Sequence, residues 1–516
     1  MINPNGEPWA DQTLCVWDIY SSELIPFIYV TTDSYGEAKL NLVPGYYNIF
    51  YYGRWGTPTW PIYTIYWLYS IEEPLFENRT VILDGRQAQP VTLNIVVDQT
   101  IPRGSCANWL YKPSTVNVTY SFSYTAGHWR FHNYVLQATA KLGDLNMLFR
   151  FEEVRGKEIT DLYPIKSPVV YDLFYTMVGE ITGPVVYTVD NTTLQKMALV
   201  KAKHFSTTMN PKVYWWGSFA FATEFLQPAA SAVWTRYLVP IERDEYLTPN
   251  TEYIVHVTPG ELGPLTFIEP NRIYRPGEII EKTWLQQLLK PWTIEASRKG
   301  NSILVRGSFT DAELHVGDSE LQNAMSFKTE VYKDDVLIYS VSDRYLWYQT
   351  VTPEEANYRI ELYSRNKPYI GGEWSSYSIE TFTTIKFRSK YTEGVENLPI
   401  INLNYKIPGL RLNNVKVVSK KDPLIIQLIP QHLKGLDISG MDARFWYSFD
   451  DGVTWIEAGD VVKGTDGWIV KLTNAKDNYI SIKTLVIDID GNSIEQIIIR
   501  AFYVTTTPQK FWFDIQ

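Results

Sequence analysis

Short runs in which apolar and polar residues alternate follow one another along most of the chain, with turn residues between them. Residues 13–97 alternate in this way, and residues 398–516 contain such a run about every ten residues. A period of two is the pattern of a β-strand with one buried face. Aromatic residues, which favour pleated surfaces, are abundant, with 36 Tyr, 22 Phe and 18 Trp. The sequence therefore predicts an all-β protein built from tandem β-sandwich domains.

The length of 516 residues suggests roughly three to five domains. We expect a sandwich at residues 1–99, a central β-rich domain at 100–300, a sandwich at 301–395 and a last sandwich at 396–516.

One short helix is expected near residues 278–289. Its predicted apolar face carries Ile280, Trp284, Leu285, Leu288 and Leu289. Pro291 would end it.

The first predicted domain has a turn before a strand, Val43-Pro44-Gly45-Tyr46 followed by Tyr47 to Tyr52. This arrangement resembles transthyretin-like or carboxypeptidase-regulatory-like sandwiches, whereas the later domains are expected to be immunoglobulin-like.

The net charge of −10 disfavours nucleic acid as a partner, because an acidic surface repels phosphates. No apolar run reaches the roughly 18 residues of a membrane span. The first residues lack the basic and apolar regions of a signal peptide, so we expect any secretion signal to lie upstream of Met1.

Cys15 and Cys106 are the two cysteines, and they are expected to form either a disulfide or two buried free thiols. Three glycosylation sequons begin at Asn78, Asn117 and Asn191. They favour a secreted or cell-surface glycoprotein.

The sharpest local motif is S-x-D-x-G-x-T-W, the Asp-box pattern. It consists of Ser448, Asp450, Gly452, Thr454 and Trp455. Its expected role is structural, because the aspartate accepts hydrogen bonds from turn N–H groups and the glycine permits positive φ. The run Asp488 to Asn492 is expected to be a hairpin turn, since its glycine is misplaced for a calcium loop.

Catalytic motifs are missing from the sequence. It contains no H-E-x-x-H, no G-x-S-x-G and no subtilisin-type histidine or serine motif. His128 and His132 could form a metal pair on one strand face, and paired carboxylates of a glycosidase could lie anywhere. We expect no catalytic residue, no metal and no cofactor, so enzyme activity in this chain is not favoured.

Aromatic residues gather at residues 51–55, 63–69 and 214–216. Exposed, they would stack on sugar rings or bind polypeptide; buried, they would form the core, which we favour.

Several segments together resemble the region that follows the catalytic domain in large secreted subtilisin-like serine proteases of actinobacteria. They are residues 80–91, 171–173, 274–277, 447–455 and 480–502. The last is the most specific, with Asp490-Gly491-Asn492, Glu495-Gln496 and Arg500-Ala501-Phe502. The catalytic aspartate, histidine and serine motifs of that family are absent, so no catalytic residue is carried over.

The resemblance implies a noncatalytic accessory region that positions an upstream or separate protease domain, or that binds polysaccharide, a protein polymer or the cell surface. The alternatives are a glycan-binding protein and a self-associating structural protein of a surface layer or filament.

Overall fold

The computed structural model describes residues 1–20, 27–59, 62–113, 120–126, 130–136, 143–155, 167–178, 181, 183–221, 230–260, 265–317, 325–367, 374–419, 422–473 and 476–507. Five β-sheets account for most of these residues. The all-β prediction is therefore confirmed.

Two sheets of seven strands are built mainly from the first half of the chain. The first contains, in spatial order, β11 (Val185–Val189), β5 (Gln89–Ile95), β8 (Arg130–Leu136), β4 (Ile62–Leu75), β3 (Gly45–Thr59), β1 (Thr13–Asp18) and β2 (Phe27–Thr31). The second contains β19 (Ile279–Trp284), β12 (Ala198–His204), β15 (Ile241–Leu247), β10 (Val169–Val178), β9 (Gly143–Arg155), β6 (Thr100–Pro113) and β7 (Tyr120–Ala126).

A ten-stranded sheet connects the two halves. Its strands are β14 (Ala230–Val239), β13 (Lys212–Phe221), β16 (Glu252–Thr258), β17 (Phe267–Ile268), β22 (Val316–Gly317), β21 (Ser302–Thr310), β20 (Lys290–Gly300) and β28 (Thr392–Asn397), with β18 (Arg272–Ile273) beside β16 and β25 (Leu346–Thr350) beside β21.

The remaining strands form a nine-stranded and a four-stranded sheet. The larger contains β24 (Val336–Ser342), β23 (Met325–Lys333), β26 (Ala356–Asn366), β27 (Glu380–Ser389), β37 (Ser493–Thr505), β36 (Asn478–Asp488), β32 (Met441–Ser448) and β33 (Ile456–Glu457), with β30 (Val415–Val417) beside β37. The smaller contains β29 (Ile401–Lys406), β31 (Leu424–His432), β35 (Trp468–Leu472) and β34 (Val461–Lys463).

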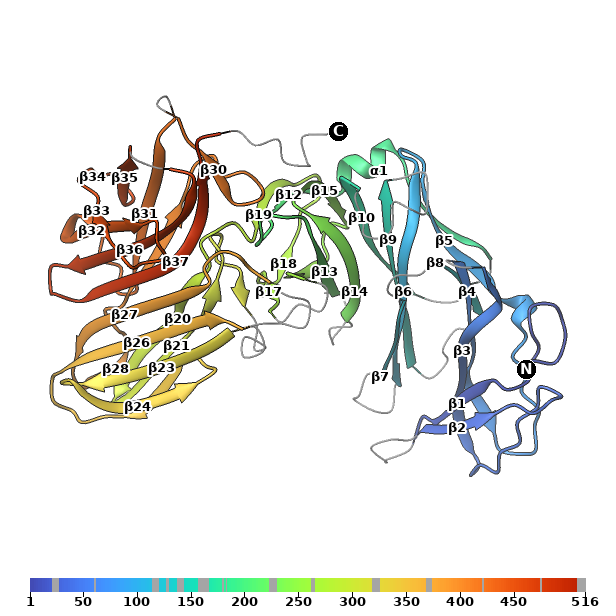
Figure 1. Ribbon diagram of the computed structural model, residues 1–516. Helices are drawn as coiled ribbons and strands as arrows, with labels where there is room; N and C mark the ends of the chain where they lie inside the picture. The colour runs from blue at the N-terminus through green and yellow to red at the C-terminus, as the bar shows by residue number, and fades with distance from the viewer. Residues whose placement is uncertain are drawn as a thin grey trace.

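The second seven-stranded sheet is the middle layer of a three-layer stack, as Figure 1 shows. On β9, Phe149 and Phe151 face the first sheet and pack with Trp17 and Trp67. The alternate residue Arg150 faces the ten-stranded sheet, where it contacts Ser218. Because successive side chains point to opposite faces, this strand is buried on both sides.

The nine-stranded sheet belongs to two sandwiches at once. One half packs on β21 and β25 of the ten-stranded sheet, where Ile303 and Trp347 share a core with Ile360. The other half packs on the four-stranded sheet, where Leu428 belongs to the same core as Ile482. One continuous core therefore runs through the second half of the molecule.

The helix predicted near residues 278–289 is wrong. Residues 279–284 form strand β19, which pairs in parallel with β12, and Leu285 has a φ of 58° that breaks the extended chain. Leu285, Leu288 and Leu289 are buried. The apolar pattern therefore predicts their burial correctly, but it predicts the wrong secondary structure. The one α-helix among the described residues is α1 (Asn191–Lys196).

Strand pairing crosses each predicted domain boundary. Strand β11 pairs with β5 across residue 99, β20 pairs with β21 across residue 300, and β27 pairs with β37 across residue 395. The sheets therefore exchange strands between segments that the sequence presents as successive units.

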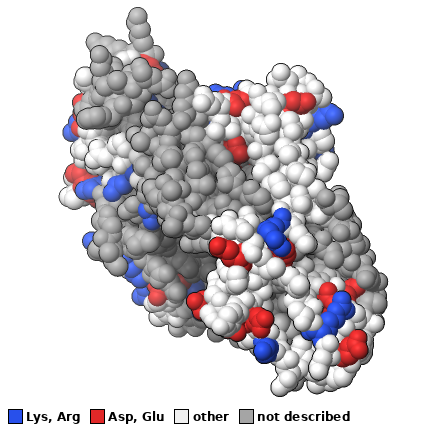
Figure 2. Space-filling view, turned by 90° about the vertical axis from the view of Figure 1, so that its right-hand side faces the viewer, with Lys and Arg blue, Asp and Glu red and all other residues white. Residues whose placement is uncertain are grey.

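Acidic and basic side chains lie interspersed over the described part of the face shown in Figure 2. Within the residues that the structure describes, no helix is long and apolar enough to cross a membrane.

Candidate functional site

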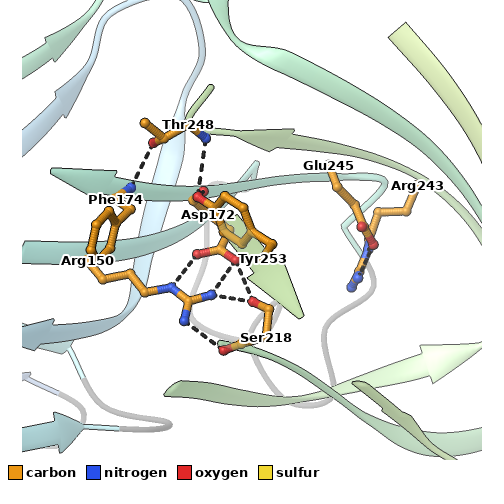
Figure 3. A network of polar contacts seen from close by, with 8 residues as sticks. All are labelled: Arg150, Asp172, Phe174, Ser218, Arg243, Glu245, Thr248 and Tyr253. Carbon is orange, nitrogen blue, oxygen red and sulfur yellow. Dashed lines mark hydrogen bonds and ion pairs between the residues drawn. The ribbon is translucent and has the colours of Figure 1, made fainter. Parts of the chain in front are cut away.

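A buried ion pair between β9 and β10 of the middle sheet is hydrogen-bonded to β13 of the ten-stranded sheet (Figure 3). The Arg150 guanidinium donates from Nε to Asp172 Oδ1 at 2.7 Å and from Nη2 to Asp172 Oδ2 at 2.5 Å. Its Nη1 donates to the backbone oxygen of Ser218 at 2.7 Å, and the Ser218 hydroxyl donates to Asp172 Oδ2 at 2.7 Å. Arg150 and Asp172 are both fully buried, so their charges are neutralised by each other and by hydrogen bonds.

Tyr253 and Thr248 extend this network. The Tyr253 hydroxyl donates to the backbone oxygen of Asp172 at 3.2 Å, and Thr248 Oγ1 accepts from the backbone N–H of Phe174 at 2.8 Å. Burial alone lowers the pKa of Arg150, but the charge and hydrogen bonds of Asp172 raise it above its ordinary value. The guanidinium therefore stays charged and locked in place.

A second buried cluster lies near the first, around His204. His204 Nε2 lies 3.1 Å from Glu245 Oε1, and the Tyr237 hydroxyl lies 2.8 Å from His204 Nδ1. Arg243 donates from Nε to Glu245 at 2.9 Å and stacks on Trp216 with 5.0 Å to the ring centroid. The tautomer that satisfies both contacts carries its proton on Nε2 and accepts from Tyr237 at Nδ1.

The His204 cluster holds one neutral and one charged partner. Burial lowers the pKa of His204 to about 4. Burial raises the pKa of Glu245, but Arg243 and His204 outweigh this effect and bring it down to about 2. A neutral histidine and an ionised glutamate, both enclosed and paired, act as structural contacts and not as a proton-transfer pair.

Four segments far apart in sequence meet at Asn414, which is fully buried. Its Oδ1 accepts from the backbone N–H of Gln287 at 3.0 Å. Its Nδ2 donates to the backbone oxygens of Ser206 at 2.9 Å and Leu285 at 3.2 Å. Ser378 joins them by donating to Gln287 Oε1 at 2.8 Å. We call these five residues the Asn414 junction; it links the end of β12 to segments that precede β20, β27 and β30.

A concave site lies on the open face of the nine-stranded sheet. It has a volume of about 330 Å³, and its walls come from β23, β26 and β27. The lining residues are Lys328, Glu330, Glu361, Leu362, Tyr363, Phe382, Thr383 and Thr384. This volume lies at the lower end of the range for ligand pockets, about 300–1,000 Å³. We call it the β23–β27 cavity.

The predicted turn motif at residues 448–455 has a dense set of hydrogen bonds. Asp450 Oδ1 accepts from the backbone N–H of Thr454 at 2.9 Å, and its Oδ2 accepts from the Thr454 hydroxyl at 2.6 Å. Ser448 Oγ accepts from the backbone N–H of Gly452 at 2.9 Å. The hydrogen bonds from Thr454 bring the pKa of Asp450 down to about 2, so the carboxylate is ionised at neutral pH.

Gly452 and Trp455 complete this turn. Gly452 has a φ of 85°, which side chains with a Cβ rarely adopt. A Cβ at Gly452 would lie 3.1 Å from Trp455 Cζ2 and 3.0 Å from Ile499 Cδ1. Trp455 thus packs directly against the glycine.

Residues 488–492 form the hairpin turn between β36 and β37. Asp488 Oδ1 accepts from the backbone N–H groups of Asp490 and Asn492 at 2.9 and 2.8 Å. The other oxygen, Oδ2, lies 3.2 Å from His432 Nε2. Asp488 therefore stabilises the hairpin turn that the sequence predicts here.

Cys15 is a buried free thiol in the structure, so it is not paired with Cys106. Burial raises the pKa of Cys15 to about 11, which leaves the thiol protonated and poorly nucleophilic. Cys106 lies on β6 of the second sheet, whereas Cys15 lies on β1 of the first.

Asn78 and Asn191 are both exposed, and Asn191 is the first residue of α1. Asn117 lies outside the described residues.

Where the structure describes their side chains, the residues of the aromatic clusters are mostly buried. Tyr51, Trp67, Tyr214 and Trp216 are buried, and Tyr52 is exposed by 54%.

His132 lies on β8, and His128 lies outside the described residues. Over the part of the chain that the structure describes, no group of three or more His, Cys, Asp or Glu is placed to hold a metal ion.

Sequence reasoning missed the Arg150–Asp172 pair, the Asn414 junction and the β23–β27 cavity. Each depends on strand register between distant segments, and a single sequence does not encode register in its local pattern. The sequence carries one signal of the cavity, since Glu361 and Tyr363, like Phe382 and Thr384, are two residues apart, as residues on one face of a strand are.

Comparisons with known proteins give no family. No protein-family model matches the chain, and no curated protein matches it. The N-terminal eight Ig domains of Down Syndrome Cell Adhesion Molecule align over 94% of this chain and 94% of that chain, with 7% identity and a TM-score of 0.17. The chicken CNTN1 FN1-FN3 domains align over 60% of this chain and 95% of that one, with 11% identity and a TM-score of 0.13. The human Desmocollin-1 ectodomain aligns over 96% and 93%, with 9% identity and a TM-score of 0.14. At these TM-scores the alignments carry no inference about this chain.

Proposed function

We propose that the chain is a noncatalytic scaffold of the extracellular space that holds a recognition surface in a fixed position. The observation that carries this proposal is the Asn414 junction, where fully enclosed hydrogen bonds join segments from distant parts of the chain. The hydrogen bonds that Arg150 and Asp172 form with Ser218 also join the middle sheet to the ten-stranded sheet. Sheets that share buried polar contacts resist independent motion, because separating them would leave those groups unpaired.

The resemblance to the region downstream of subtilisin-like catalytic domains supports a location and a partner for this scaffold. In that setting the chain is secreted or displayed on the cell surface, and it holds a protease close to a polymeric substrate or the cell envelope. The exposed sequons at Asn78 and Asn191 support the same location.

The first test is an activity assay on the purified chain with casein, with and without a serine-directed inhibitor. A scaffold produces no hydrolysis. Hydrolysis that the inhibitor abolishes would contradict the proposal.

The second test measures positioning. A subtilisin-like protease of the same organism should digest an insoluble protein polymer faster when the chain is added, whereas its digestion of soluble casein should not change. The variant Asn414→Ala, which loosens the junction, should reduce the acceleration. Equal acceleration on both substrates, or none on either, would argue against a positioning role.

A second candidate function is self-assembly into a surface layer, and strand β24 favours it. This strand lies at the edge of the nine-stranded sheet, and its sequence VLIYSVS contains no charged residue. Val336 and Leu337 are exposed by 65% and 48%. Edge strands normally carry charges or proline that block pairing, so a second copy of β24 could add to this edge.

Sedimentation over a range of concentrations, with calcium present, tests the assembly. We expect association that Leu337→Lys abolishes and that Val453→Lys, at an exposed turn position, leaves unchanged. A monomer at all concentrations would exclude it.

A further inference from the structure

The β23–β27 cavity lies over a regular block of six side chains from three adjacent strands. Strand register places Lys328 opposite Tyr363 and Tyr363 opposite Phe382 in one row. The next row places Glu330 opposite Glu361 and Glu361 opposite Thr384. One row is thus mainly aromatic and the other mainly polar, and both point out of the same open face.

The aromatic row offers an exposed apolar surface. The rings of Tyr363 and Phe382 lie 5.0 Å apart between centroids with their planes tilted by 43°, and Phe382 is exposed by 41%. The Tyr363 hydroxyl donates to Glu380 Oε1 at 2.6 Å, which fixes the ring. The Phe382 ring therefore stands beside an anchored partner with part of its surface open to a ligand.

The charges at the cavity are already paired. Lys328 Nζ lies 2.7 Å from Glu330 Oε1, and Arg359 forms an ion pair with Glu361. A cationic ligand would have to compete with Lys328 and Arg359 for the carboxylates. An anionic ligand would face the two glutamates. A neutral ligand with many hydroxyl groups avoids both costs, because hydroxyls accept from Lys328 and donate to Glu330 and Glu361.

We propose that the β23–β27 cavity binds a neutral sugar ring of a polysaccharide, with the apolar face of the ring on Phe382 and its hydroxyls on Lys328, Glu330 and Glu361. This site deepens the proposed function, because the sugar polymer would be the surface to which the scaffold attaches.

The same row of side chains continues across the sheet. Phe382 lies opposite Ile497, Ile497 opposite Lys483, and Lys483 opposite Trp446. From Tyr363 to Trp446 the row spans four strand spacings, about 19 Å. A polysaccharide that enters the cavity can therefore extend across the strands along this row.

The test is calorimetric titration of the full chain with cellohexaose, xylohexaose, laminarihexaose and mannohexaose. We expect at least one neutral hexasaccharide to bind, and Phe382→Ala to weaken its binding by about tenfold. Phe382→Leu, which keeps apolar bulk but lacks the ring, should weaken it as well. Tyr348→Ala, at a tyrosine of β25 exposed by 65%, is the matched control and should bind as the unmodified chain does.

Three results would overturn the site. They are no binding of any neutral hexasaccharide at millimolar concentration, equal loss in Phe382→Ala and Tyr348→Ala, and tighter binding of oligogalacturonate or chitosan hexamers than of every neutral one. None of them alters the casein and positioning assays, so failure of this site and failure of the scaffold proposal are distinguishable.

Discussion

Individual buried charges decide how the middle layer of this molecule is held. Arg150 and Asp172 lie on β9 and β10 beside large apolar residues such as Phe149 and Leu173, and both charged residues are fully buried. A charge in such a position is tolerated only when it is paired and hydrogen-bonded. The pair therefore fixes which face of β9 and β10 meets the ten-stranded sheet.

Removing one member of this pair should destabilise the fold strongly. Asp172→Ala leaves Arg150 buried without its partner, and we expect the free energy of unfolding to fall by about 3–5 kcal/mol in urea denaturation. The control is Glu457→Ala, which removes the exposed partner of Arg444 at 2.8 Å and should cost at most about 1 kcal/mol. Similar small losses in both variants would mean that the buried pair does not hold the sheets together.

His204 gives the fold a defined response to acid. Its pKa is lowered by burial to about 4, below the ordinary value near 6.5 that it takes in the unfolded chain. As the pH falls from 6.5 towards 4, His204 therefore becomes protonated in the unfolded chain but stays neutral in the folded chain. Stability from the neutral histidine is complete above about pH 6.5 and is lost below it.

The variant His204→Gln tests this response, since glutamine can still donate to Glu245 and accept from Tyr237. Between pH 7 and 5 the unmodified chain should lose about 2 kcal/mol more stability than the variant, measured by urea midpoints at each pH. His256, whose pKa burial also lowers to about 4, should leave a residual slope in both proteins. If stability falls equally with pH in both proteins, protonation of His204 is not coupled to folding.

At the scale of single elements, the sequence pattern predicts the turn at residues 448–455 correctly and the helix near residues 278–289 wrongly. The turn at residues 448–455 has the hydrogen bonds that its residue types allow, because they act between near neighbours. The segment 279–284 has apolar residues at spacings that suit a helix, yet it pairs with β12 as a strand. Pairing with a distant strand overrode the local preference.

Gly452 is the position at which this turn is most sensitive. Gly452→Ala forces a side chain into a φ of 85° and against Trp455 and Ile499, and we expect a loss of about 1–3 kcal/mol. Gly459→Ala is the matched control, because a Cβ there meets nothing within 4 Å. Thermal unfolding followed by tryptophan fluorescence compares the two. Equal midpoints would show that the turn accommodates a side chain.

At the scale of the whole molecule, strands from distant segments are interleaved and the Asn414 junction ties them together. Strand β37 pairs with both β36 and β27, so the last strand among the described residues completes a sheet begun near residue 325. Because of this exchange of strands, the bounds expected for successive domains do not coincide with the boundaries of the sheets.

The junction predicts how the molecule unfolds. Asn414→Ala leaves the backbone groups of Ser206, Leu285 and Gln287 without their partner, which should cost at least about 3 kcal/mol. In the unmodified chain, calorimetry should show that the second seven-stranded sheet and the sheets of the C-terminal half unfold in one transition. In the variant, it should show two unfolding transitions. Asn414→Gly removes the same hydrogen bonds, but glycine tolerates the φ of 57° at this position. This variant should therefore also show two unfolding transitions. Separate transitions in the unmodified chain would contradict the coupling.

The sequence by itself determined the all-β class, the turns at residues 448–455 and 488–492, and the burial of Trp284, Leu285 and Leu289. These properties follow from period-two alternation, from hydrogen bonds between near neighbours and from hydrophobicity, all of which act locally. Only the tertiary structure decided which strands share a sheet, which face of β9 carries a charge inward and which side chains line the β23–β27 cavity. Those outcomes depend on pairing register between segments up to hundreds of residues apart, where a shift of one residue would turn every side chain to the opposite face.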